Sequence, residues 1–180
     1  MLRKRAEWLN QLQGWLRRNG QRAAVVGLGQ EWGGDDAAGL QVARTMLRAK
    51  SLAGSAWLVV DAGSAPENCL GALRRHKPDL VLLVDAAEMG ESPGAVRLLD
   101  WKAATGLSAS THTLPLHLMA RYLEADLGCE VALIGIQPAN LSFGALLSPE
   151  VRRATEGVAR GLLEATRAKG GRADERLSEI

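Results

Sequence analysis

An uninterrupted aliphatic run at residues 80–84 constrains the fold more than any other stretch of this chain. A strand in a parallel sheet is covered by helices on both faces, so it carries apolar residues at every position instead of alternating ones. Further buried-strand patterns occur at 23–27, 57–60 and 131–136. The sequence therefore predicts a mostly parallel sheet that is buried on both sides.

Segments with apolar residues at helical spacing lie between these runs, which indicates alternating strands and helices. The expected helices span about 36–50, 68–75, 116–127 and 149–166. A weakly alternating stretch at 95–100 is an additional candidate strand. The fold class is therefore α/β, a three-layer α/β/α sandwich with a mostly parallel central sheet of about five strands.

A further helix is expected before the first strand, at residues 2–18, and Asn19-Gly20 is a typical end for it. We expect Trp8 and Trp15 to pack this helix on the rest of the chain, with a partner surface as the alternative. The chain then divides into an N-terminal helical extension (1–20), a single α/β domain (21–168) and a polar C-terminal tail (169–180).

Composition excludes several classes of protein. A formal net charge of +2 gives no support for nucleic-acid binding, and no apolar run approaches the roughly 20 residues that span a bilayer. There is no signal-peptide pattern. The two cysteines, Cys69 and Cys129, form no Cys-x-x-Cys pair, so two buried or idle thiols in a reducing cytosol are expected. These features predict a cytoplasmic protein that binds neither nucleic acid nor membrane.

The glycine-rich loop at 27–39 joins the first strand to the first inner helix and delivers two adjacent acids, Asp35 and Asp36. One acid near a helix start is common because it complements the unpaired N–H groups there, and we assign this capping role to Asp35. A dinucleotide fingerprint would need glycine where Trp32 stands, and the Gly-Lys-Ser/Thr of a P-loop is missing. The acidic loop instead indicates a cation or a positively charged ligand.

Other polar residues follow the ends of the strands. Ligands in open α/β sheets bind beyond the carboxyl ends of the strands, so we expect these residues to converge with Asp36 at one edge. Carboxylates and an imidazole without a thiolate suit a hard-to-borderline metal ion. The residues concerned are Asp61, Asp85, His112 and Gln137.

Each candidate also has a purely structural interpretation. Asp85 could cap the segment that follows its strand, and Asp61 could brace the turn at 63–64 through its side chain. His112, between two threonines, could be a local hydrogen-bonding group at a helix start. The chain has no Gly-x-Ser-x-Gly elbow and no His-Glu-x-x-His motif. A catalytic centre would therefore depend on the carboxylates, on His112 or on a metal that arrives from outside.

Seven short motifs occur in a specific order and spacing over residues 23–163. The motifs are Gly27-Leu28-Gly29, Asp35-Asp36-Ala37-Ala38-Gly39, Asp61-Ala62-Gly63-Ser64-Ala65-Pro66-Glu67-Asn68, Val84-Asp85-Ala86, Pro93-Gly94, Thr111-His112-Thr113-Leu114-Pro115 and Gly135-Ile136-Gln137-Pro138. Together they resemble the NiFe-hydrogenase maturation endopeptidases, above all the branch that serves the formate-hydrogenlyase type of hydrogenase. Gln30 departs from the family's Gly-x-Gly-Asn start, and Ala62 stands where a second glycine is common.

The resemblance implies a peptidase domain at 21–168, classed by its family as aspartic-type, that removes the C-terminal extension of a hydrogenase large-subunit precursor after nickel insertion. It implies that Asp36, Asp85 and His112 contact nickel, that Asp36 and Asp85 are catalytic, and that the enzyme has no metal cofactor of its own because the substrate brings the nickel. The expected partner is this nickel-containing precursor, and the enzyme is expected to be a monomer. The alternative is a non-enzymatic metal-sensing or chaperone-like module on the same fold.

Overall fold

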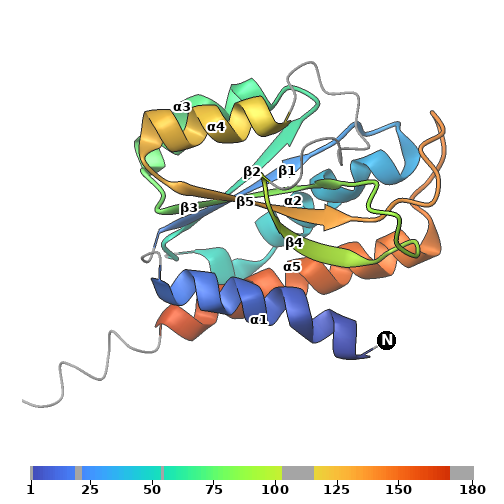
Figure 1. The fold of residues 1–180 in the computed structure, drawn as a ribbon, viewed down its shortest axis with the longest axis horizontal. Coiled ribbons are helices and arrows are strands. Elements are labelled where there is room, and N and C mark those ends of the chain that lie inside the picture. Colours follow the sequence, from blue (N-terminus) through green and yellow to red (C-terminus); the bar gives the residue numbers. More distant parts are fainter. Residues whose placement is uncertain (1, 19–21, 54, 103–115, 171–180) are drawn as a thin grey trace, which may run out of the picture.

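The computed structural model describes residues 2–18, 22–53, 55–102 and 116–170 (Figure 1). Its centre is a five-stranded sheet in the order β2-β1-β3-β5-β4. The first four of these strands are parallel, and β4 pairs antiparallel with β5 at one edge. The predicted sheet and its additional strand are confirmed. The strands are β1 (Ala23–Leu28), β2 (Trp57–Gly63), β3 (Leu80–Ala86), β4 (Val96–Asp100) and β5 (Glu130–Ile136).

Helices cover both faces of the sheet, which confirms the three layers (Figure 1). One face carries α3 (Leu70–His76) and α4 (Leu116–Leu127). The other carries α2 (Ala38–Leu47), α5 (Pro149–Gly170) and α1 (Leu2–Arg18). Three 3₁₀ turns complete the elements: η1 (Gly34–Ala37), η2 (Lys50–Leu52) and η3 (Pro66–Cys69).

The predicted bounds of two helices were wrong. The first inner helix was expected at 36–50, but η1 precedes it and it ends at Leu47. The last helix was expected to stop near 166 but continues to Gly170. Polar residues at helix ends carry little periodic signal, which is why their pattern misplaces such ends.

Alternate residues of each strand enter two separate hydrophobic cores. In β3, Leu82 and Val84 pack with α2 and α5, whereas Val81 and Leu83 pack with α3 and α4. We call these sides the α2 face and the α4 face. The alternation of side chains along a strand assigns the next residue of β3, Asp85, to the α4 face.

The N-terminal helix shares the core on the α2 face. Trp8 is buried and Trp15 packs against the same core, so the predicted packing of both rings is confirmed. A Cβ on Gly161 of α5 would lie 2.9 Å from the Trp8 ring, so this ring packs directly against the backbone of α5 at the glycine. In the part of the chain that the structure describes, no helix has the length and apolar character of a membrane span.

Candidate active site

The carboxyl edge of the sheet is where the loop after β1 turns into η1 and α2. Two glycines make this turn tight. A Cβ on Gly39 would lie 2.0 Å from the carbonyl oxygen of Val84, and a Cβ on Gly27 would lie 2.3 Å from that of Gly39. Because of this close approach, α2 begins in contact with β1 and β3, and η1, which carries Asp36, also contacts β3.

Asp36 is held by the glycine-rich loop and is only 7% exposed. Its Oδ2 accepts a hydrogen bond from the backbone N–H of Gln30 at 2.9 Å. Gly29 has a φ of +132°, and a Cβ there would lie 1.8 Å from the carbonyl oxygen of Asp36; a Cβ on Gly33 would lie 2.9 Å from the Cβ of Asp36. The loop glycines thus make room for Asp36 itself, so no bound phosphate is needed to explain them.

Asp85 is the second carboxylate at this edge. It was expected just after the third strand, but it lies within β3, where its ladder partner is Gly135 of β5. The side chain is fully buried, and its Oδ1 accepts a hydrogen bond from the N–H of Ala86 at 2.9 Å. Asp85 directly follows Val84, against whose carbonyl oxygen α2 begins. Asp36 and Asp85 are therefore brought to the same edge of the sheet.

His112 lies outside the described residues. The helix that follows it, α4, begins four residues later at Leu116. A helix that precedes a parallel strand runs opposite to the strand, so α4 begins at the carboxyl edge. Within the described ranges, no three His, Cys, Asp or Glu side chains form a group that could hold a metal ion. Asp36 and Asp85 would need a further ligand from outside these ranges.

Asp35 does not cap its own helical turn, and that prediction was wrong. It is fully buried and makes no side-chain capping bond to η1. Its Oδ2 instead accepts hydrogen bonds from the N–H groups of Ala139 and Asn140 and from the hydroxyl of Ser148, each at 2.8 Å, and its Oδ1 accepts one from the N–H of Ser148 at 2.7 Å. Asp35 therefore ties the loop between β5 and α5 to the turn that carries Asp36.

Asp61 does not join the other carboxylates. In β2, Asp61 is the register partner of Gly27 in β1, and its side chain lies on the α2 face. Asp85 lies on the α4 face of β3, two strands away. The Oδ2 of Asp61 accepts a hydrogen bond from Nε of Arg44 at 2.7 Å, so the predicted brace of the turn at 63–64 gives way to an ion pair. Hydrogen bonds to Asp61 and Glu31 raise the pKa of Arg44 further above its usual range.

Gln137 lies at the expected edge but has a structural role. Its Oε1 accepts hydrogen bonds from the N–H groups of Met89 (2.7 Å) and Glu91 (3.2 Å), and its Nε2 donates one to Glu88 (2.8 Å). The side chain is buried. Gln137 therefore fixes the loop after β3.

The two cysteines are buried and unpaired with each other, as predicted. Burial raises the pKa of Cys69 and that of Cys129 to about 11 each. A thiol with such a pKa holds little of the thiolate form that a nucleophile needs at neutral pH. A cysteine-dependent mechanism is therefore disfavoured, and the carboxylates are the better candidates.

Comparison with known proteins identifies hydrogenase maturation proteases as relatives. Residues 40–165 match the family model HycI, described as hydrogenase maturation protease. The hydrogenase 3 maturation protease of Escherichia coli (strain K12) is 35% identical over 153 residues, which are 84% of this chain and 95% of that protein.

Solved structures of similar proteins share the fold. The crystal structure of the NiFe hydrogenase maturation protease HycI from Thermococcus kodakarensis KOD1 has a TM-score of 0.76 at 30% identity, covering 87% of this chain and 98% of that one. The solution structure of the endopeptidase HycI from Escherichia coli has a TM-score of 0.68 at 34% identity, covering 77% and 87%.

Proposed function

The chain belongs to the hydrogenase maturation protease family, and from this premise we propose that it removes the C-terminal extension of a NiFe-hydrogenase large-subunit precursor. Members of this family hydrolyse peptide bonds, so the chain is an enzyme and a hydrolase. This favours the proteolytic function over the alternative of a metal-sensing module without catalysis.

The observation that supports this proposal most strongly is the pair of acids at the carboxyl edge. Asp36 and Asp85 come from different elements, and both are buried, which is costly for a charged group unless the structure compensates it. Asp35 has a structural role, because its hydrogen bonds join η1 to the loop between β5 and α5. Two acids that the fold maintains at a ligand-binding edge are therefore the groups we propose to act on the substrate.

We further propose that these two acids and His112 bind nickel that the precursor brings. Three protein ligands leave coordination positions for groups of the substrate, including thiolates, and nickel accepts imidazole and thiolate together with oxygen ligands. His112 is four residues from the start of α4, so the chain length keeps its backbone within about 14 Å of Leu116. The enzyme itself then requires no metal cofactor.

Binding the substrate's nickel would also orient the substrate for hydrolysis. The metal anchors the precursor, so the flexible extension is held at the edge of the sheet and the reacting groups meet without a separate encounter. Asp36 or Asp85 then serves as the general base toward water, or the metal activates the water. A dyad that shares one proton is disfavoured, because carboxylates that bind a metal ion are not free to share a proton.

Cleavage of a nickel-loaded large-subunit precursor from the same organism tests this proposal. Mass spectrometry of the precursor reports the loss of its C-terminal extension. We expect the wild type to cleave, and Asp36→Asn and Asp85→Asn each to slow cleavage at least about 100-fold, the usual effect of losing a catalytic acid or base. His112→Ala should also slow cleavage, because it removes the proposed imidazole ligand of the nickel. Metal-free precursor should remain intact.

Asp61→Asn is the matched control, because this carboxylate lies on the α2 face and pairs with Arg44. It should cleave at the wild-type rate. Circular dichroism would verify that every variant is folded. Equal cleavage by the wild type and a triple variant of the three proposed ligands would exclude the site, and an intact precursor with every preparation of wild type would exclude the function.

A further inference from the structure

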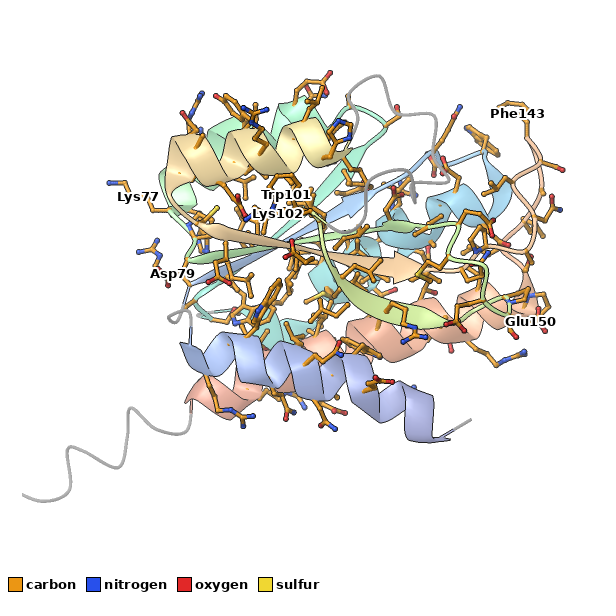
Figure 2. The ribbon with its side chains drawn as sticks, in the orientation of Figure 1. Lys77, Asp79, Trp101, Lys102, Phe143 and Glu150 are labelled. Atoms are coloured by element: carbon orange, nitrogen blue, oxygen red, sulfur yellow. The ribbon has the colours of Figure 1, made fainter. Side chains whose placement is uncertain are left out.

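Large apolar side chains gather on two loops beside the candidate active site. Of the seven exposed large apolar residues in the described ranges, four lie on the loop after β1 or on the loop between β5 and α5. Trp32 is 63% exposed, Phe143 80% and Leu146 89%, and Leu141 is the fourth. Phe143 lies at the outer margin of the molecule (Figure 2). We call these four residues the apolar platform.

The two loops of the apolar platform are fastened to each other. The N–H of Gly144 donates a hydrogen bond to the carbonyl oxygen of Trp32 at 2.7 Å. A Cβ on Gly34 would lie 2.5 Å from the carbonyl oxygen of Asn140, and Asp35 adds its four hydrogen bonds across the same junction. The platform is therefore formed before any partner binds, which lowers the entropy cost of an interface.

The apolar platform is also continuous with the candidate active site. Trp32 lies in the turn in which Gln30 binds the Asp36 carboxylate and Gly33 packs against its Cβ. A protein seated on the platform is thus adjacent to Asp36. A second copy of this chain seated there would obstruct the edge at which the precursor has to arrive, which argues for the substrate as the occupant.

We propose that the apolar platform docks an apolar surface on the folded body of the large-subunit precursor, separate from the nickel and the extension. This inference rests on the proposed function. Exposed tryptophan and phenylalanine side chains on a fixed surface are typical of the residues that contribute most to protein–protein affinity. Docking through the platform would select a folded precursor and reject free peptides that merely carry a similar extension.

Two measurements with one set of variants test the docking surface. The variants are Phe143→Ser, Leu146→Ser and the double change, and the control is Leu47→Ser, a 52%-exposed leucine at the far end of α2. For cleavage of nickel-loaded precursor, we expect the double change to raise KM at least about tenfold with kcat within about twofold. The Kd for the same precursor, measured by biolayer interferometry, should rise by the same factor, and Leu47→Ser should change neither quantity.

The outcomes separate the two proposals. If the folded double variant cleaves the precursor as the wild type does, with an unchanged KM and Kd, the docking surface alone is overturned. If the wild type binds the precursor through the platform but does not cleave it, the docking surface is supported and the proposed function is overturned. If the wild type neither binds nor cleaves the precursor, both proposals are overturned. Sedimentation velocity could also show that the wild type is a dimer and that the double change dissociates it. This result would assign the platform to a second copy of the chain and overturn the proposal.

Discussion

Removing the Asp35 carboxylate should destabilise the protein far more than the loss of a helix cap would. Asp35→Ala leaves three N–H groups and one hydroxyl without their acceptor. Ala139 and Asn140 are exposed, so water can replace the lost acceptor, and the loss of each of these two hydrogen bonds should lower the free energy of unfolding by about 0.5–1 kcal/mol. Ser148 is half-buried, so the loss of the acceptor for its N–H and for its hydroxyl should cost about 1–2 kcal/mol each. The free energy of unfolding should therefore fall by about 4 kcal/mol.

Urea unfolding followed by far-UV circular dichroism measures this loss. The corresponding fall in Tm is about 8–16 °C for a chain of this length. Asp35→Asn keeps one acceptor oxygen and should lose about 2 kcal/mol. The matched control is Asp61→Ala, which breaks an exposed ion pair and should cost less than about 1 kcal/mol. If Asp35→Ala costs about 1 kcal/mol or less, the value for a simple cap, then Asp35 does not fasten the two loops.

Two further predictions concern the core. Gly39→Ala places a Cβ 2.0 Å from the Val84 carbonyl oxygen, so we expect thermal unfolding to show a loss of at least about 3 kcal/mol or no folded protein. Gly71→Ala on α3 places a Cβ 3.5 Å from the Arg75 side chain, an ordinary contact, and should be neutral or stabilising by up to about 1 kcal/mol. Equal Tm values for the two variants would contradict the close approach at Gly39. Cys69 and Cys129 should react with a thiol reagent at pH 8 only after unfolding, and rapid labelling of native protein would contradict their burial. Because their pKa values are raised to about 11, the unfolded thiols ionise first, so stability should be unaffected below about pH 9 and should fall as the pH rises from about 9 toward 11.

The sequence by itself determined the layers of the fold. The aliphatic run of β3 requires cover on both faces, and the strong helical periodicity of α4 set both of its ends at the predicted residues. The position of Asp85 at the end of an apolar run and of Asp36 after the glycine loop was likewise local information. These features depend on neighbouring residues, which is why the pattern was sufficient to predict them.

The partners of the other acids were decided only by the tertiary structure. Asp35 binds groups more than 100 positions away, at residues 139, 140 and 148, and no local pattern distinguishes such a role from a helix cap. Asp61 was expected to converge with Asp85, but the strand order and register put them on opposite faces of the sheet. Side-chain direction at a strand end depends on which helices cover each face, and that is settled when the sheet assembles.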